Sequence, residues 1–401
     1  MRTEAVVVGA GPAGLIAARE MARSGVSVKV IEEHERIGEP KHCAGVLSVE
    51  GLQRLGVEPS RDFIQHEVRG GRAYSPDGQE IRITGSRTRA YVVDRAAFDR
   101  HLANLASEEG AEIETGTRVT ELKQKRGRVV GVVAAGKSVE CEVVINGEGI
   151  GGRLARTVGL QRPSTGVLRG VNAEVSGVEL EPHIVEVWMG EEIAPGLFAW
   201  VIPLPDGGAR CGLACSEGDP VSRLSHFMGR RFGEVEHSKP VVWPVNTGGP
   251  VERTYGDGIL LVGDVAGQAK PTTGGGVVMG GLCALEAAST AVEALHVGYS
   301  SSASLRLYEG LWRRKYGREF SSMLAARRFV NRLSDGRLNR MFDAVRGARL
   351  EGALEGLVDE GDMDLQSGVM MSALGHPGLL RALVSTAGRV ALAELRGLFN
   401  L

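Results

Sequence analysis

The chain begins with a strand, a glycine-rich turn, a helix and a second strand, and this order constrains its fold more than any other feature. Residues 4–8 form a short apolar run typical of a buried strand. Gly9-Ala10-Gly11-Pro12-Ala13-Gly14 follows, and residues 15–24 then have helical spacing. The second apolar run, 26–31, ends at Glu32. A lone glycine pattern is weak, but this full order predicts a dinucleotide-binding βαβ unit.

Each part of this unit has a physical role in binding a pyrophosphate. Gly9 permits the tight turn, Gly11 lets the backbone approach the phosphates, and Gly14 lets the helix pack on the strand. Ala13 belongs to the same turn, and the N-terminus of the helix over residues 15–24 faces the negative charge of the phosphates. Glu32 is placed to accept the two ribose hydroxyls, which suits a ribose without a 2′-phosphate. The acid alone does not separate NAD from FAD.

A strand and a glycine turn far along the chain favour FAD. The apolar run 258–262 ends at Gly263-Asp264, where a carboxylate beside a glycine is placed to hold a ribityl hydroxyl. The turn 271–276 follows, and it ends in Gly274, Gly275 and Gly276. It opens a helix over residues 277–295, whose N-terminus would stabilise negative charge on a reduced flavin ring. The alternative for Gly263-Asp264 is a strand-end turn with an exposed carboxylate.

The segment Tyr91-Val92-Val93-Asp94-Arg95-Ala96-Ala97-Phe98-Asp99 indicates a strand feeding a helix. With the glycine turn and Gly263-Asp264, it resembles the para-hydroxybenzoate hydroxylase superfamily of flavoproteins. The resemblance implies that Arg95 and Asp264 contact FAD. That superfamily often has an Asp-Gly pair at the end of a further middle strand. Here the corresponding segment is Asn146-Gly147-Glu148, with Glu148 in the acid position.

Two more segments resemble the geranylgeranyl reductases, particularly the archaeal enzymes that saturate the prenyl chains of membrane lipids. They are Lys41-His42-Cys43-Ala44-Gly45-Val46-Leu47-Ser48 and Ala194-Pro195-Gly196-Leu197-Phe198-Ala199-Trp200-Val201-Ile202-Pro203. In that family the first is a loop beside the flavin, and the second is a strand that lines the substrate cavity. The resemblance runs from residue 1 to about residue 330. It implies an FAD-dependent reductase of isolated C=C bonds in geranylgeranyl chains, acting on archaeal-type membrane lipids.

Three positions depart from the family pattern. Ala44 replaces the first glycine of the loop, although the resemblance still places it with Cys43 beside the flavin. Phe198 stands where the family usually has Tyr, and Ile202 stands where it usually has Phe. These two changes remove a phenol hydrogen bond and reshape an apolar wall. They bear on chain length and regiospecificity more than on the class of reaction.

Three aromatic residues are the candidate substrate contacts: Trp188, Phe198 and Trp200. Bulky apolar residues at strand spacing are more often core than ligand wall. The resemblance reverses that preference and places them in an apolar cavity over the reactive face of the flavin.

Cys43 and His42 are the candidate catalytic residues. A free cysteine is most often a small buried hydrophobe, but this one shares a loop with Lys41, and a nearby cation favours the thiolate. We expect Cys43, His42 or an ordered water to give the proton that completes reduction of the double bond. A redox pair of Cys43 with Cys283 is a further hypothesis.

The expected fold class is α/β, with a Rossmann-like FAD-binding domain, an inserted β-rich substrate domain and a helical C-terminal region. The FAD-binding domain takes residues 1–170 and 250–300, the substrate domain takes 70–94 and 165–250, and the helical region takes 301–401. In the helical region, basic residues alternate with apolar ones: Arg313, Arg314, Arg318, Arg327 and Arg328. This pattern fits either a solvated helical cap or a basic surface that meets anionic lipid headgroups.

Composition and charge limit the partners and the compartment. A net charge of −2 and a pI near 6.5 give no reason to expect nucleic-acid binding. The five cysteines show no metal-ligand spacing, so we expect no metal and a reducing, cytoplasmic location. Peripheral contact with the inner face of the membrane stays open, but no apolar run predicts a spanning helix. The electron donor is left open: the external reductant is either docking NAD(P)H or a ferredoxin-type donor.

Three other functions share this scaffold. An aromatic-ring hydroxylase or related flavin monooxygenase would use oxygen, but the Cys43 loop and the strand at 198–203 argue against it. An electron-transfer flavoprotein that reduces a quinone would need an iron–sulfur partner, since this chain has no cluster-binding spacing. A prenyl cyclase would form a ring without changing the mass of its substrate.

Overall fold

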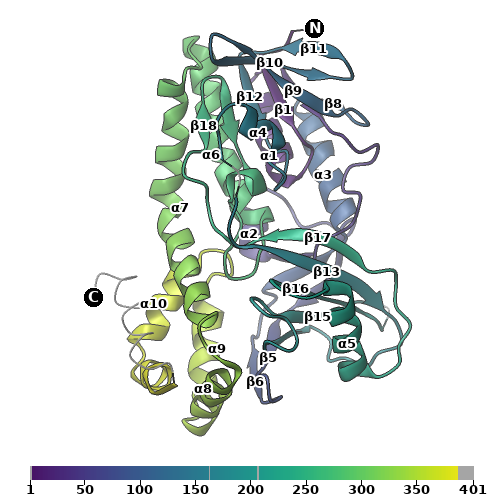
Figure 1. Cartoon of the computed structure of the whole chain (residues 1–401), viewed down its shortest axis with the longest axis vertical. Helices are drawn as coiled ribbons and strands as arrows, with labels where there is room; N and C mark the ends of the chain where they lie inside the picture. Colours follow the sequence, from purple (N-terminus) through teal and green to yellow (C-terminus); the bar gives the residue numbers. More distant parts are fainter. Residues whose placement is uncertain (1, 162, 206, 387–401) are drawn as a thin grey trace.

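The computed structural model describes residues 2–161, 163–205 and 207–386. Figure 1 shows a parallel-sheet region around β1 and α6 at one end of the molecule and a sheet with α5 at the other. The strands of the second sheet are antiparallel except for the parallel pair β14 and β5. The long helix α7 runs along one side, from the parallel-sheet region toward α8, α9 and α10. The predicted fold class is confirmed.

A six-stranded sheet forms the centre of the nucleotide-binding region. Its strands run in the order β18 (Tyr255–Gly256), β19 (Ile259–Leu261), β12 (Val143–Asn146), β1 (Ala5–Val8), β2 (Val28–Ile31) and β8 (Glu112–Glu114). All neighbours are parallel except β18 and β19. Because β1, β12 and β19 are buried on both faces, they are short apolar runs without alternation. The helices beside them are α1 (Pro12–Arg23), α3 (Arg95–Glu108) and α6 (Val277–Val297).

Two three-stranded antiparallel sheets flank this centre. One contains β9 (Val119–Lys125), β10 (Arg128–Ala134) and β11 (Lys137–Glu140). The other contains β3 (Val46–Ser48), β4 (Ile64–Val68) and β7 (Ala90–Val93). Short helices follow β3 and β12, namely α2 (Val49–Arg54) and α4 (Arg153–Thr157), and the 3-10 helix η1 (Gly263–Ala266) follows β19.

The β-rich region is a seven-stranded sheet. Its order is β17 (Val241–Asn246), β13 (Val167–Val175), β16 (Ala209–Cys215), β15 (Ala199–Pro203), β14 (Ile184–Trp188), β5 (Gly70–Tyr74) and β6 (Glu80–Thr84). Helix α5 (Pro220–Phe232) packs on one face. The sequence assigns residues 70–94 to this domain, but β7 at 90–93 pairs with β3 and β4 instead. Pairing between strands distant in sequence decides this placement, and no local pattern reveals it.

The C-terminal region is mostly helical, and residues 377–386 are helical as well as the four helices named next. It consists of α7 (Ser302–Val330), α8 (Asp335–Gly347), α9 (Glu351–Glu360) and α10 (Ser367–Gly375). The predicted range 301–401 extends beyond residue 386, and its last part lies outside the described residues. Within the described chain, α6 alone has the length and mean hydropathy of a membrane span, although 78% of its apolar window is buried inside the protein. Its apolar composition is therefore accounted for by its place in the core.

Helices α1 and α6 approach each other closely because small residues line their contact. A Cβ at Gly281 would lie 2.7 Å from Ile16 Cδ1, and one at Gly280 would lie 3.2 Å from the Cα of Gly263. Gly14 is equally confined, since its Cβ would lie 2.2 Å from the carbonyl oxygen of Gly9. The glycines thus bring the first turns of α1, α6 and η1 to one place.

Tyr308 of α7 supports η1 through hydrogen bonds. Its side chain is fully buried, and its hydroxyl donates to the Leu261 carbonyl at 2.8 Å. The same hydroxyl accepts a hydrogen bond from Gln268 Nε2 at 2.7 Å, and Gln268 Oε1 accepts from the Gly263 amide at 3.0 Å. The C-terminal region therefore supports the turn that carries Asp264.

Replacing Tyr308 with Phe tests this support. The variant leaves Gln268 Nε2 and the Leu261 carbonyl without their buried partner, which costs about 1–3 kcal/mol. Urea denaturation of the apoprotein should show a lower free energy of unfolding. Tyr299→Phe is the matched control, because Tyr299 is 68% exposed and should leave stability unchanged. Equal unfolding midpoints for the two variants would contradict this role of Tyr308.

Candidate active site

The first glycine turn leaves an open space at the N-terminus of α1. Gly9 has a φ of +91°, and a Cβ there would lie 2.6 Å from the Gly147 carbonyl oxygen. Gly11 is different, because a Cβ added to it meets no heavy atom within 4 Å. No side chain in the described chain caps the helix that starts after Gly11. Free amides beside an open backbone fit a pyrophosphate.

Glu32 ends β2 beside this turn. It is 8% exposed, and its Oε2 accepts a hydrogen bond from the Ala10 amide at 2.7 Å. Its Oε1 accepts from the His34 amide at 3.0 Å. A hollow of about 450 Å³ lies next to this end of the strand, and its lining includes His34, Glu35, Arg36, Glu39 and Pro40. A buried acid beside a hollow fits the adenosine end of a dinucleotide.

The Gly263-Asp264 segment lies against the first glycine turn. A Cβ at Gly263, whose φ is +70°, would lie 3.0 Å from the Cβ of Ala13. A Cβ at Gly276 would lie 3.0 Å from Asp264 Oδ1. Within the described residues the Asp264 carboxylate makes no hydrogen bond, so it is an available acceptor in a partly buried place. This fits a ribityl hydroxyl.

The triple glycine closes the turn before α6. Gly274 has a φ of +74°, and a Cβ there would lie 2.3 Å from Val245 Cγ1. A Cβ at Gly275 would lie 2.9 Å from Lys270 Cε, so both positions are too tight for a side chain. Gly276 precedes the first helical residue and offers no capping side chain. Within the described residues, the first amides of α6 therefore have no capping side chain.

Arg95 makes a two-pronged contact with Asp99 one helical turn later. Its Nη2 donates to both carboxylate oxygens at 3.1 Å, and its Nε donates to Oδ1 at 3.2 Å. Burial acts to lower the pKa of Arg95, but Asp99 and Cys43 outweigh it and raise the pKa above its ordinary value. The charged guanidinium thus lies beside Cys43. Lys41, the cation expected there, pairs instead with Asp94 at 2.6 Å.

His42 and Arg95 share one space with Asp264. Burial raises the pKa of the Asp264 carboxyl, and the charges of His42 and Arg95 oppose that shift. The His42 ring lies 5.9 Å from the ring of Trp243, and its Nδ1 lies 2.7 Å from the Pro40 carbonyl oxygen. The loop after β2, the start of α3 and η1 therefore converge.

Arg210 fixes the Cys43 loop. The sequence pattern did not identify this arginine as a site residue. Its Nη1 donates to the Ala44 carbonyl at 2.9 Å, and its Nη2 donates to Glu174 at 2.9 Å. The Cys43 sulfur in turn accepts from the Gly45 amide at 3.4 Å. A lone arginine in the otherwise small and apolar strand β16 was the available signal. Arg210 joins the seven-stranded sheet to the nucleotide-binding region.

Phe198 and Trp200 lie on the face of the seven-stranded sheet that covers the Cys43 loop. Their rings meet edge to face at 6.2 Å, and they share an apolar cluster with Ala44 and Trp243. Trp200 is 8% exposed, and its indole N–H donates to Asn172 Oδ1 at 3.0 Å. Its ring is therefore largely buried in this apolar cluster.

Trp188 does not join this wall. It pairs across the sheet with Ala199, whereas Trp200 pairs with Val187, so the two indoles point to opposite faces. Trp188 stacks on Tyr74 with ring centres 3.9 Å apart. This placement corrects its assignment to the same cavity as Trp200. A hollow of about 390 Å³ beside it is lined by Tyr74, Trp188, Phe227, Arg230 and Arg231.

The structure also places Glu148 and the two cysteines of the hypothesised redox pair. The Glu148 carboxylate accepts hydrogen bonds from the amides of Leu154 and Ala155, both at 2.8 Å, so it caps α4 rather than facing the site. Cys43 and Cys283 are both free, and Cys283 is fully buried in the core, where burial raises the pKa of its thiol well above the usual range. The proposed redox pair is therefore not formed. Within the described residues, no group of three His, Cys, Asp or Glu side chains is arranged to hold a metal ion.

The fold and this site define a flavin-dependent oxidoreductase. Residues 2–281 match the family model described as an FAD binding domain, which confirms the predicted cofactor. The chain is 36% identical over 363 residues to a digeranylgeranylglycerophospholipid reductase of Methanothermobacter thermautotrophicus, covering 87% of this chain and 93% of that protein. A reductase of the same name from Methanopyrus kandleri is also 36% identical, with coverage of 86% and 91%. The chain belongs to the digeranylgeranylglycerophospholipid reductase family.

Solved structures agree with this membership. A geranylgeranyl bacteriochlorophyll reductase-like protein from Thermoplasma acidophilum aligns with a TM-score of 0.85 and 25% identity, over 99% of both chains. The flavin-dependent brominase Bmp2 aligns with a TM-score of 0.70 at 18% identity, over 99% of this chain and 100% of that chain. The second likeness shows the fold alone.

Two alanine substitutions separate folding from cofactor binding. Gly11→Ala places a methyl group in open space at an extended backbone position, so the apoprotein should keep its melting temperature. The methyl group stands where a pyrophosphate must approach, so FAD should bind about tenfold more weakly or worse. Gly14→Ala should instead destabilise the apoprotein by about 1–3 kcal/mol, because its Cβ would lie 2.2 Å from Gly9 O. FAD fluorescence titration and thermal melting measure the two effects. Unchanged FAD affinity in Gly11→Ala would rule out this pyrophosphate site.

Proposed function

We propose that this protein is an FAD-dependent reductase that saturates isolated C=C bonds in the geranylgeranyl chains of archaeal-type membrane lipids. The observation that carries the proposal is the family relationship over most of the chain, combined with a cofactor site assembled from three distant segments. An apolar cluster that includes Phe198 and Trp200 covers the loop beside that site. Such a cover suits a hydrocarbon substrate.

Some residues of the chain would bind FAD, and others would transfer the proton. Gly11 and the start of α1 would hold the pyrophosphate, Glu32 the adenosine ribose, and Asp264 the ribityl chain. When bound in its reduced form, FAD supplies the hydride that one carbon of the double bond receives. The N-terminus of α6 would stabilise negative charge beside it.

We assign the proton for the second carbon to Cys43 Sγ, with His42 as the alternative donor. Cys43 lies beside the Arg95 guanidinium, which stabilises the thiolate left after proton transfer. Solvent then returns the proton to sulfur. An isolated alkene has no carbonyl to absorb charge, so a well-placed acid and exclusion of water matter most.

The electron donor and the location also belong to this proposal. Reduction by docking NAD(P)H and reduction by a ferredoxin-type protein both fit this proposal. A prenylated lipid substrate favours a cytoplasmic protein in peripheral contact with the inner face of the membrane. The basic side of α7, which carries Arg314 and Arg328, is the surface we assign to that contact.

The direct test uses the reduced holoprotein and a geranylgeranylated glycerophospholipid. After reduction with dithionite under argon, the lipid should gain about two mass units for each double bond that is reduced. Mass spectrometry of the extracted lipid measures the gain. A new ring at unchanged mass would support a cyclase, and NAD(P)H oxidation stimulated by a phenol and oxygen would support a hydroxylase. Unchanged lipid with unchanged flavin oxidation would refute prenyl reduction.

Cys43→Ala tests the proton donor. We expect single-turnover reduction of the double bond to slow by about 10²-fold or more, the usual contribution of a general acid. FAD affinity should stay close to that of the native protein, because the loop is also held by Arg210 through a backbone carbonyl. His42→Gln is the comparison variant and should slow the step less. A larger loss in His42→Gln than in Cys43→Ala would transfer the role to His42.

A further inference from the structure

The segment Lys270–Gly276, here called the glycine loop, is closed by the backbone of its first residue. The Lys270 amide donates to the Gly275 carbonyl at 3.0 Å. The Lys270 carbonyl accepts from the Gly274 amide at 2.7 Å and from the Thr273 amide at 3.2 Å. Both ends of the loop therefore depend on where Lys270 is held. The loop leads directly into the first turn of α6.

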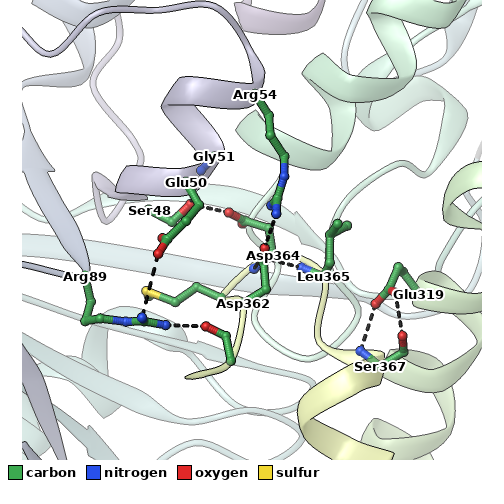
Figure 2. A network of polar contacts seen from close by, with 12 residues as sticks. Ser48, Glu50, Gly51, Arg54, Arg89, Glu319, Asp362, Asp364, Leu365 and Ser367 are labelled. Carbon is green, nitrogen blue, oxygen red and sulfur yellow. Dashed lines mark hydrogen bonds and ion pairs between the residues drawn. The ribbon is translucent and has the colours of Figure 1, made fainter. Parts of the chain in front are cut away.

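The Lys270 side chain is anchored in the C-terminal region. Its Nζ lies 2.7 Å from Asp364 Oδ1 and donates to the Met363 carbonyl at 3.2 Å. The side chains of Lys270 and Asp364 are 14% and 2% exposed, so the pair is largely shielded from water. Asp364 Oδ2 also accepts a hydrogen bond from Ser48 Oγ, which in turn accepts from the Gly51 amide at the start of α2. Figure 2 shows Asp364 between Ser48 and the chain leading to Ser367.

The next two residues of the glycine loop are held by the same region. Thr272 Oγ1 donates to Gln366 Oε1 at 2.8 Å. Arg327 Nη1 donates to the Pro271 carbonyl at 3.3 Å. Three consecutive residues of the loop thus contact helices or connections beyond residue 301.

The segment that carries Asp364 is itself fixed from its other side. We call residues 359–366 the clasp. Arg54 of α2 pairs with Asp362 (Figure 2). Arg89 donates to the Asp359 carbonyl at 2.9 Å. Gly51 leaves the necessary space, since a Cβ there would lie 2.7 Å from Asp364 Oδ2. The clasp therefore has little freedom to move with the glycine loop.

Stability alone is a weak explanation for a buried lysine–aspartate pair. Removing two charges from water costs free energy that their attraction only partly returns, and apolar residues of similar size often serve as well. What this pair supplies is a fixed position for Lys270. The far end of the same loop, Gly276, lies against Asp264, the acceptor assigned to the ribityl chain. A shift of the glycine loop at Lys270 would therefore also move Gly276 relative to Asp264.

We propose that Asp364 is a positioning residue of the flavin site: through Lys270 it fixes the glycine loop and the N-terminus of α6 against the cofactor. The C-terminal region then acts as a part of the cofactor site, although it lies outside the matched FAD-binding segment 2–281. The proposal rests on FAD binding and not on the identity of the lipid, so its test needs no prenyl substrate.

Asp364→Asn in the full-length chain tests the proposal. The variant leaves the Lys270 ammonium without its carboxylate, so the glycine loop should open more often. In the apoprotein, hydrogen exchange at the Gly274 and Lys270 amides should rise about tenfold or more. The dissociation constant for FAD should rise by about the same factor.

Glu286→Gln is the matched control. Glu286 of α6 pairs with Lys315 of α7 at 2.6 Å, so it also joins the C-terminal region to the nucleotide-binding region through a lysine–carboxylate pair. It lies ten residues beyond Gly276 and does not contact the glycine loop. The control should lower thermal stability without changing loop exchange or FAD affinity. Equal loop exchange and equal FAD affinity in the two variants would overturn the proposal.

Two further variants test the proposal if Asp364→Asn folds poorly or acts only through its change of charge. Thr272→Val removes only the bond to Gln366 and should give a smaller change in the same direction. Lys270→Met combined with Asp364→Asn removes both charges together, so the local net charge is unchanged. The two-electron potential of the bound flavin should then fall by about 30 mV, which corresponds to tenfold weaker relative binding of the reduced form. An unchanged potential with unchanged loop exchange would show that the pair does not position the loop.

Discussion

The structure depends on the close approach of α1, α6 and η1. Glycine at their contacts permits this approach, because a Cβ at Gly280 would lie 3.2 Å from the Cα of Gly263 and one at Gly281 would lie 2.7 Å from Ile16 Cδ1. Because two helices begin at this contact, their unpaired amides face one region of space. Asp264 lies in the same place with a carboxylate that no donor in the described chain satisfies. One packing constraint therefore creates the features that a dinucleotide requires.

The parts of this arrangement that were predictable are those with local signals. The βαβ unit, the strand that ends at Gly263-Asp264 and the start of α6 all follow from apolar runs next to glycine. The predicted end of that helix at 295 is two residues short, a normal uncertainty for helix ends. Convergence of the segments could be expected from the parallel sheet, because β1, β12 and β19 are neighbours whose carboxyl ends share an edge.

The parts that were missed depend on pairing or contact across the chain. Trp188 and Trp200 look equivalent in sequence, but register across β14 and β15 sends them to opposite faces. Glu148 resembles a ligand acid, yet α4 begins nearby and takes its carboxylate as a cap. Arg210 and Asp364 act on residues 166 and 94 positions away, and a single sequence gives no sign of such partners. The substrate cavity was likewise only partly predictable. The apolar residues predict an apolar surface, but they do not predict whether that surface encloses an open volume.

The central claim is that one FAD is held by the α1 turn, Asp264 and the start of α6, with its ring against the Cys43 loop. A crystal structure of the FAD-bound protein is the most direct measurement. If the claim is correct, density for the pyrophosphate will lie at Gly11, the ribityl chain will be within hydrogen-bonding distance of Asp264, and the ring will lie between Gly276 and Cys43. A flavin ring bound elsewhere, or a ribityl chain distant from Asp264, would contradict it.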